Sequence, residues 1–402
     1  MTLHTGRHFL QIPGPTNVPD RVLRAIDAPT IDHRGPEFAP LGMEVLRGLQ
    51  HVFQTQQPVV IYPASGTGAW EAALVNTLSP GDRVLMYETG HFATLWRRMA
   101  GKLELDVELL ASDWRRGADP ASIEAALAAD RSHAIKAVCV VHNETSTGAL
   151  SDIAAVRQAI DAAGHPALLL VDSISGLACA DLRHDEWGID VTIGGSQKGL
   201  MLPPGIGFNA VSPRALEAAK SAKLGRAYWA WDEIIAMNAD GYWPSTPNTN
   251  LLYGLAESLD MLLGEGLADV FARHDRWAAG VRAAVDAWRL PIQCADPARR
   301  SPVLTGVLLP AGVDADAVRR LVYERFDVSL GTGLGKVKGR MFRIGHLGDS
   351  NDVTLVATIA ACEMGLKLAG VALAASGVHA AMDHFAAHPA RFGKAGESRK
   401  DQ

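Results

Sequence analysis

The sequence is poor in several features that mark particular classes of protein. Its 402 residues include only four cysteines, which lie far apart without a C-x-x-C pair, so we expect neither a disulfide framework nor a metal site. Aromatic residues make up only 6% of a chain of net charge −6, and no block of Lys or Arg occurs, which argues against nucleic-acid binding. The apolar runs are too short to cross a membrane, and the N-terminus lacks the apolar core of a signal peptide. We therefore expect a cytoplasmic protein.

Short apolar runs alternate with Ala- and Leu-rich stretches between residue 21 and about residue 250. The runs predict strands at Val59–Tyr62, Arg83–Tyr87, Asp106–Leu110, Ile135–Val141, Ala167–Val171 and Asp190–Ile193. The stretches between them predict helices at Trp70–Leu78, Phe92–Lys102, Pro120–Ala129 and Ile153–Ala163. Strands that are apolar on both faces are typical of a mostly parallel sheet covered by helices, so we expect an α/β fold.

The pattern divides the chain into four parts. Residues 1–20 are rich in Pro and Gly and predict an extended arm, and residues 21–250 predict a large domain. Residues 251–380 predict a smaller C-terminal α/β domain, and residues 381–402 are expected to be a flexible tail. A helix at Leu251–Leu263 is expected to lead out of the large domain. The small domain is expected to hold strands around Val303–Leu308, Val328–Gly331 and Arg340–Ile344, and helices at Leu267–Trp288, Asp314–Phe326 and Asp352–Ala369.

Lys198 is the first candidate for chemistry. It follows an apolar strand within Gly194–Gly199, where small residues let a bulky group approach the backbone. A lysine in a dry site has a lowered pKa and can form a Schiff base, whereas an isolated lysine at a strand end is normally solvated. Asp172 ends another apolar strand, where open α/β sheets bind ligands. Its carboxylate could hold a pyridine nitrogen protonated, or it could simply cap a turn.

Two further segments complete a possible site. Ser65, Gly66 and Thr67 lie between a predicted strand and a predicted helix, where free N–H groups can bind phosphate, although many such turns are merely structural. Arg343 lies within an apolar strand, where its guanidinium could bind a carboxylate or form a structural salt bridge. Together these features are what pyridoxal 5'-phosphate (PLP) chemistry on an amino or oxo acid requires.

The motifs resemble those of a known family. The sequence is similar to the class V, fold-type I PLP-dependent aminotransferases, in particular the serine–glyoxylate and alanine–glyoxylate branch. The resemblance covers nearly the whole chain, from Pro13–Asn17 to the strand Arg343–His346 and the helix beyond it. Its specific matches, in order, are Asp32–Arg34, Pro63–Gly68, His142–Gly148, Asp172 and Gly194–Gly199.

The resemblance implies a role for each matching residue. Lys198 would bind the cofactor covalently and then move a proton, and Asp172 would bind the pyridine nitrogen. Arg343 would bind the substrate carboxylate, with Gly14 nearby. The remaining implied cofactor contacts are Ser65, Gly66, Thr67 and Gln197 at the phosphate, Thr145 near the phenolic oxygen, Ile174 on one ring face, and Phe92 (or His91) on the other.

The resemblance also implies a homodimer with shared active sites. Tyr242 and either Ser245 or Thr246, of which we take Thr246, would reach the phosphate of the partner subunit. The implied reaction is a ping-pong transfer of an amino group from a small L-amino acid to glyoxylate or a similar oxo acid. Serine is the leading donor, followed by alanine or aspartate; Arg34 or His346 could bind the second carboxylate of aspartate.

A PLP-dependent lyase or desulfurase is the alternative reaction. Desulfuration needs a nucleophilic cysteine in a mobile loop over the site. The segment Gly331–Gly335 and its surroundings contain no cysteine, which disfavours this alternative.

Overall fold

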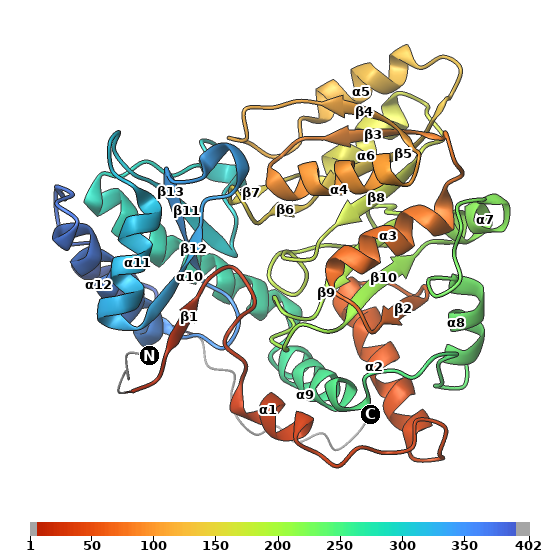
Figure 1. Ribbon diagram of the computed structural model, residues 1–402, viewed down its shortest axis with the longest axis horizontal. Helices are drawn as coiled ribbons and strands as arrows, with labels where there is room; N and C mark the ends of the chain where they lie inside the picture. The colour runs from red at the N-terminus through yellow and green to blue at the C-terminus, as the bar shows by residue number, and fades with distance from the viewer. Residues whose placement is uncertain (1–5, 391–402) are drawn as a thin grey trace.

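A seven-stranded sheet forms the centre of the large domain (Figure 1). The computed structural model describes residues 6–390, and the strand order of this sheet is β2-β10-β9-β8-β5-β3-β4. The strands are β2 (Val59–Tyr62), β3 (Arg83–Tyr87), β4 (Asp106–Leu110), β5 (Ile135–Val141), β8 (Leu168–Asp172), β9 (Val191–Gly195) and β10 (Gly207–Val211). Only β10, which we did not predict, runs antiparallel to its neighbours, so the mostly parallel sheet is confirmed.

Helices cover both faces of this sheet. The helices of the large domain are α1 (Asp20–Ile26), α2 (Phe38–Phe53), α3 (Gly66–Thr77), α4 (His91–Lys102), α5 (Pro120–Ala129), α6 (Ile153–Ala162), α7 (Pro213–Ser221), α8 (Trp231–Asn238) and α9 (Thr249–Glu265). Two short strands, β6 (Asn143–Glu144) and β7 (Ala149–Leu150), form a hairpin after β5. The predicted helices of this domain are all present, within a few residues of their expected ends.

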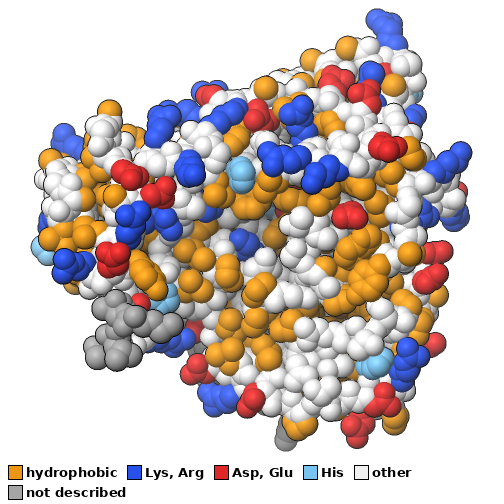
Figure 2. Space-filling view, viewed as in Figure 1, with side chains coloured by type: hydrophobic (Ala, Val, Ile, Leu, Met, Phe, Trp, Pro, Cys, Tyr) orange, Lys and Arg blue, Asp and Glu red, His pale blue; other side chains and the backbone are white. Residues whose placement is uncertain are grey.

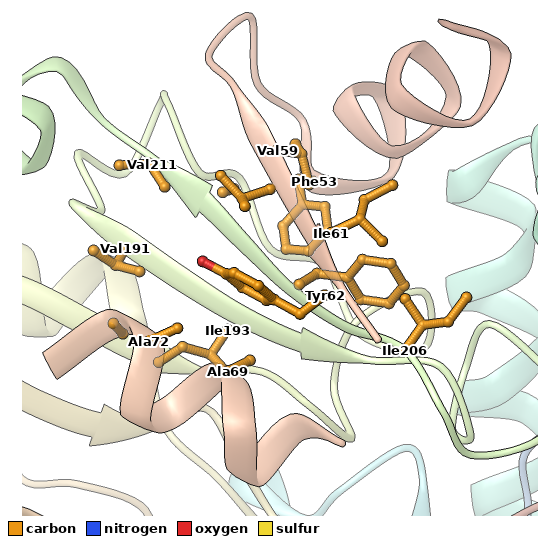
Figure 3. Close-up of a cluster of buried hydrophobic side chains, with 14 of the residues drawn as sticks. Phe53, Val59, Ile61, Tyr62, Ala69, Ala72, Val191, Ile193, Ile206 and Val211 are labelled. Atoms are coloured by element: carbon orange, nitrogen blue, oxygen red, sulfur yellow. The ribbon is translucent and has the colours of Figure 1, made fainter. Parts of the chain in front are cut away.

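The core of the large domain is built from the apolar strands that the sequence predicts. Figure 3 shows Val191 and Ile193 of β9 facing Ala69 and Ala72 of α3, where small side chains let the helix approach the sheet. Each large apolar side chain that is fully buried contributes roughly 1.5–3 kcal/mol. The polar end of the buried Tyr62 is satisfied, since its hydroxyl donates to Asn209 Oδ1 at 3.0 Å. This packing fixes the sheet edge that carries the site.

The carboxyl ends of four strands meet at one edge of the sheet. β2, β5, β8 and β9 all run in the same direction. Consequently the segments that follow them, which contain Ser65, Thr145, Asp172 and Lys198, lie at that edge. In open α/β sheets this edge is where ligands bind.

A second, four-stranded sheet lies in the small domain, in the order β1-β12-β13-β11. Its strands are β1 (Phe9–Gln11), β11 (Leu304–Leu308), β12 (Val328–Thr332) and β13 (Met341–Gly345). Its helices are α10 (Leu267–Trp288), α11 (Ala315–Phe326), α12 (Asp352–Leu368) and α13 (Gly377–Ala387), with short 3-10 turns η1 (Pro297–Arg299) and η2 (Gly335–Val337). The N-terminal arm is extended as predicted, and part of it is the strand β1, which pairs parallel to β12.

The expected tail is partly wrong. Residues 377–387 form α13, whose Ala381 and Phe385 are buried against the small domain. The side chain of Glu363, in α12, accepts hydrogen bonds from the N–H groups of Gly377 and Val378, so the start of α13 is fixed from a distance in the sequence. The remainder of the predicted tail, residues 391–402, and residues 1–5 of the arm lie outside the described residues.

Candidate active site

A cavity opens at the strand ends where the two domains meet, and Figure 2 shows the molecule hollowed there, with apolar side chains around the hollow. The residues that line it are Ser65, Gly66, Thr67, Trp70, Phe92, Thr145, Asp172, Ile174, Gln197 and Lys198. All except Trp70 belong to the predicted cofactor set. The structure therefore brings together residues that are up to 133 positions apart, the separation of Ser65 from Lys198.

Lys198 is held in the dry environment that its proposed chemistry needs. Its side chain is buried, and Nζ donates a hydrogen bond to the carbonyl of Pro13 on the N-terminal arm. Burial and the nearby Arg343 charge lower the pKa of Lys198 to about 8. A methyl group placed on Gly14 would lie only 2.6 Å from Nζ. Only glycine at position 14 allows the arm to approach the lysine this closely.

Asp172 lies in the same cavity and is only 4% exposed. Its Oδ1 accepts a hydrogen bond from the N–H of Ile174 at 2.8 Å. Burial raises the pKa of Asp172 to about 7, against the lowering effect of that N–H and of the Trp70 indole that faces it. The Trp70 N–H is buried and forms no hydrogen bond of normal geometry within residues 6–390. A cation placed beside Asp172 would lower this pKa, because an opposite charge favours the carboxylate.

The loop Ser65–Thr67 leads into the N-terminus of α3, as the sequence predicts. N–H groups in the first turn of a helix have no intrahelical partner, so they can bind an anion together with the helix dipole. A methyl group on Gly66 would lie 2.4 Å from Ile174 Cδ1, so glycine keeps this loop against the cavity wall. Gln197 Oε1 is buried and forms no hydrogen bond to any described residue. The free N–H groups of the loop and the apolar walls suit a phosphate-bearing aromatic cofactor, whereas Gln197 would have to turn its amide NH₂ toward the phosphate.

Arg343, on β13, brings the small domain to the site. Its Nε donates to the Thr332 carbonyl at 2.8 Å and its Nη1 donates to the Thr145 carbonyl at 2.6 Å. Burial lowers the pKa of Arg343 to about 10, an effect that the Glu144 charge opposes. A guanidinium has five N–H groups, so the two bonds fix its plane and leave donors for a ligand carboxylate.

Glu144 is a functional residue that sequence reasoning did not single out, although it lies within the motif His142–Gly148. It is fully buried and accepts hydrogen bonds from the N–H groups of Phe92 and Ala93 at the start of α4, at 3.3 and 3.2 Å. Ser146 Oγ also donates to it, at 2.6 Å. Glu144 therefore fixes the turn that carries Phe92. The signal in the sequence is a charged residue between apolar strands.

The comparisons with known proteins agree with this geometry. The family model described as aminotransferase class-V matches residues 8–345. The chain belongs to the class V aminotransferase family. Members of this family depend on PLP.

Three relatives of this aminotransferase illustrate its position in the family. It is 47% identical to a serine–glyoxylate aminotransferase from Hyphomicrobium methylovorum, with 94% of each chain aligned. It is 44% identical to an L-aspartate–glyoxylate aminotransferase from Paracoccus denitrificans, over 95% of this chain and 97% of the relative. The crystal structure of an alanine–glyoxylate aminotransferase from Nostoc sp. superposes with a TM-score of 0.85 at 30% identity, covering 91% of this chain and 97% of that one. The fold-type I architecture is thereby confirmed.

Tyr242 and Thr246 are not among the residues that line the cavity. The Tyr242 hydroxyl donates to the Gly35 carbonyl at 3.3 Å, and Thr246 Oγ1 lies 3.5 Å from His33 Nε2. Ser245 is beside Thr246, and Arg34 is exposed, with its Nε donating to His33. These residues thus gather around the Asp32–Gly35 segment. Within this chain none of them lines the cavity.

The expectation that His346 could bind a second carboxylate is wrong. His346 is fully buried; its Nδ1 lies 2.8 Å from the Pro302 carbonyl and its Nε2 lies 3.1 Å from Thr305 Oγ1. Burial lowers the pKa of His346 to about 3, so the imidazole is neutral at physiological pH. It is a core residue of the small domain rather than a substrate cation.

The described residues show neither a membrane-spanning helix nor a cluster of metal-binding side chains. No helix within residues 6–390 combines the length and the apolar character that a membrane span requires. The same residues contain no group of three or more His, Cys, Asp or Glu side chains arranged to hold a metal ion.

Proposed function

We propose that this class V aminotransferase binds PLP in the cavity and transfers the amino group of serine to glyoxylate. The observation that carries the proposal is a buried lysine and a buried carboxylate, Lys198 and Asp172, lining one cavity, with a buried guanidinium beside its wall. That guanidinium belongs to Arg343, which donates to the carbonyl of Thr145, a lining residue. When bound, PLP supplies an electron sink for the bond that breaks at the substrate Cα. The other steps below belong to residues of this chain.

The residues at the two ends of the cavity would hold the cofactor. Asp172 would bind the pyridine nitrogen, and the loop Ser65–Thr67 with the N-terminus of α3 would bind the phosphate. Gln197 would add a polar contact at the phosphate. Thr145 would lie near the phenolic oxygen, and Phe92 and Ile174 would pack on the ring.

Lys198 would be both the covalent attachment point and the proton carrier. A pKa of about 8 leaves an appreciable fraction of the amine neutral near pH 8, so Nζ can accept a proton from the substrate Cα and later return it. The Pro13 carbonyl, which accepts a hydrogen bond from Nζ, holds the side chain in the cavity. The nearby positive charge of Arg343 lowers the pKa of Lys198, so the protonated amine releases its proton more readily.

Arg343 would bind the α-carboxylate common to amino and oxo acids. Its guanidinium is fixed by two backbone carbonyls, one from each domain, so little side-chain entropy remains to be lost on binding. Among the described residues, Lys198 is the only Lys or Arg that lines the cavity, with Arg343 beside it, and burial lowers the pKa of the neighbouring His91. A donor with an uncharged side chain therefore suits this chain best. Serine satisfies that requirement, and the 47% identical relative is named for it.

Aspartate is the second donor to test, because the 44% identical relative is named an L-aspartate–glyoxylate aminotransferase. Its side-chain carboxylate would need a cation from outside the cavity of one chain. We propose a homodimer in which Tyr242 and Thr246 of each subunit reach the phosphate site of the other, with Arg34 beside them. A cytoplasmic location stays a prediction.

A desulfurase reaction is not proposed. Desulfuration needs a thiolate, and burial raises the pKa of all four thiols, Cys139, Cys179, Cys294 and Cys362. All four are buried and none lies among the residues that line the cavity.

The test is a product assay on the PLP-loaded protein. L-serine, L-alanine and L-aspartate are supplied separately with glyoxylate, and glycine and the corresponding oxo acid are quantified. We expect equal amounts of glycine and hydroxypyruvate, with kcat/KM highest for serine. Higher kcat/KM for aspartate would reassign the donor, and no glycine from any donor would overturn the proposed function.

A further inference from the structure

The loop between β12 and β13, residues 333–340, reaches from the small domain to the large domain beside the cavity. Its Lys336 Nζ lies 3.1 Å from Glu88 Oε1 and donates to the Ser112 carbonyl at 3.3 Å. The same ammonium lies 4.9 Å from the centroid of the Trp114 ring. Glu88 and Trp114 follow β3 and β4 of the large sheet. One side chain therefore makes an ion pair, a hydrogen bond and a cation–π contact across the two domains.

The receiving surface on the large domain is itself fixed by hydrogen bonds. Ser112 Oγ donates to the Glu88 carbonyl at 2.6 Å and accepts from the Trp114 N–H at 3.1 Å. Gln293 Nε2 of the small domain donates to the Trp114 carbonyl at 2.9 Å. Trp114 adopts a φ of 65°, a conformation that costs energy for a bulky residue and persists only where its surroundings enforce it. The Trp114 ring is thus held in place for the lysine.

The same loop touches both sides of the active site. At its start, the Thr332 carbonyl accepts the hydrogen bond from Arg343 Nε. Further along, a methyl group on Gly335 would lie 2.7 Å from the Trp114 ring and 3.2 Å from His91 Nδ1. His91 precedes Phe92, which lines the cavity. The loop thereby connects the guanidinium of Arg343 to the wall on which a cofactor would stack.

We propose that Lys336 is a positioning residue for substrate binding. Lys336 attaches the loop to Glu88, Ser112 and Trp114. This attachment keeps the Arg343 guanidinium in the position from which it binds a substrate carboxylate. This inference rests on the proposed function. It assigns Lys336 no contact with the substrate and no role in proton transfer, so its loss affects carboxylate binding more than turnover.

The chain offers a matched control for this lysine. Lys338 is exposed on the same loop, and within residues 6–390 its side chain makes no ion pair or hydrogen bond. Lys336→Met and Lys338→Met remove the same charge from the same loop. Lys336→Arg keeps a cation that can pair with Glu88 and stack on Trp114. Glu88→Gln removes the partner charge instead.

The experiment measures kcat and KM for serine and glyoxylate on the PLP-loaded proteins. Lys336→Met is expected to raise both KM values about three- to tenfold and to change kcat less than twofold. The rise in KM is limited because a half-exposed ion pair and a cation–π contact each contribute little free energy. Lys336→Arg should restore KM, and Lys338→Met should match wild type. Adding Glu88→Gln to Lys336→Met should raise KM no further, because the two changes remove one interaction.

The outcomes separate this inference from the proposed function. If wild-type protein forms no glycine from any donor, the proposed function fails. Hydrogen exchange then tests the attachment alone: faster exchange of residues 333–340 in Lys336→Met than in Lys338→Met supports it, and equal exchange overturns it. If wild-type protein is active, unchanged KM values in Lys336→Met, or a fall in kcat alone, overturn the inference.

Discussion

Asp172 and Glu363 have almost the same exposure, 4% and 5%, but Asp172 lies deep in the molecule and Glu363 lies nearer its surface. The pKa values of the two carboxyl groups are shifted in opposite directions. Burial raises the pKa of Asp172 to about 7, because a single backbone N–H is its main compensating donor. Burial also acts on Glu363, but hydrogen bonds from Lys367, Trp288 and the start of α13 outweigh it and lower the pKa to about 2.

The contrast shows that one buried carboxylate stabilises the folded protein and the other destabilises it. Glu363 has a full set of donors and fixes α13 to the small domain. Asp172, in contrast, lies in a cavity with too few hydrogen-bond donors. The buried Lys198 in the same cavity has its pKa lowered to about 8, so its neutral form is favoured too. A buried carboxylate with too few donors destabilises the cofactor-free protein, and a ligand that supplies a donor removes that cost.

The largest effect is expected at Lys198. Lys198→Ala removes the covalent attachment point and the proton carrier together, so kcat should fall by roughly 10³-fold or more, near the upper range for general base catalysis. The measurement is glycine formation from serine and glyoxylate at saturating PLP. Lys338→Ala serves as the control and should keep full activity. A Lys198→Ala protein that kept a tenth of wild-type turnover would show that the assigned base is wrong.

Asp172→Asn should separate activity from stability. Loss of the carboxylate is expected to lower kcat by roughly 10²–10³-fold, the range for removing one preorganised electrostatic partner. The cofactor-free variant should be at least as stable as wild type at pH 8, because a poorly solvated charge is gone. Activity assays and thermal unfolding of the two cofactor-free proteins check this pair of statements. Full activity, or a clear loss of stability at pH 8, contradicts the contrast with Glu363.

Glu363→Ala is the reverse experiment. It leaves the N–H groups of Gly377 and Val378 without their acceptor, so unfolding should become easier by roughly 1–3 kcal/mol. At 25 °C the folded variant should keep wild-type kcat, because Glu363 is remote from the cavity. Denaturant unfolding gives the free energy, and Glu363→Gln, which retains an acceptor oxygen, should lose less. A stable Glu363→Ala protein with reduced kcat would reverse the assignment of roles.

The two carboxylates should also differ in the sign of their pH dependence. Glu363 has a folded pKa below its ordinary value of 4.5, so its stabilisation is present above pH 4.5 and is lost as the pH falls toward 2. Asp172 has a folded pKa above its ordinary 3.8, so its cost is absent below pH 3.8, grows as the pH rises from 3.8 to about 7 and is fully present above 7.

Thermal unfolding of cofactor-free proteins at pH 4 and pH 8 tests these signs. Relative to wild type, Asp172→Asn should gain stability at pH 8 but not at pH 4. Glu363→Gln should lose more stability at pH 8 than at pH 4. Parallel shifts of both variants at both pH values would show that the two carboxylates are not held differently.

A pair of tryptophans gives the smallest and sharpest comparison. Trp70 and Trp96 stack with centroids 5.9 Å apart, and both have buried N–H groups without a hydrogen bond to any described residue. Only Trp70 lines the cavity and faces Asp172. Trp70→Phe should weaken PLP affinity roughly two- to tenfold, the value of one hydrogen-bond donor, and Trp96→Phe should leave it nearly unchanged. Equal effects would remove the assigned link between Trp70 and Asp172.

Much of the fold follows from the sequence, because its signals are local. The strands Val59–Tyr62 and Ile135–Val141 have the predicted bounds, since runs of buried β-branched residues end at turn residues. β10 was missed because its sequence, with Gly207 and Asn209, lacks a continuous apolar run. α13 was taken for tail because its anchor, Glu363, lies 14 residues before Gly377, a separation at which no local pattern reveals the contact.

The site shows the same division between local and distant information. Lys198, Asp172 and the loop at Ser65 are marked by their positions after strands, and the structure brings them into one cavity. His346 was one of two alternatives, with Arg34, for a second cation, and its burial argues against it. The sequence shows a titratable residue but not the two hydrogen-bond partners that hold it in the core. Trp70 was missed as a cavity residue because a tryptophan within a helix usually packs in the hydrophobic core. Whether Tyr242 and Thr246 complete a partner's site depends on a second chain, which no pattern in this one describes.

The most direct test of the account is the absorption spectrum of the protein after reconstitution with PLP, recorded before and after L-serine and again after glyoxylate. The account predicts a visible band that is absent in Lys198→Ala, loses intensity with serine and returns with glyoxylate. A visible band that no amino donor changes would contradict the transamination claim. The absence of any band in the wild-type protein would contradict the assignment of Lys198, Asp172 and their cavity to PLP.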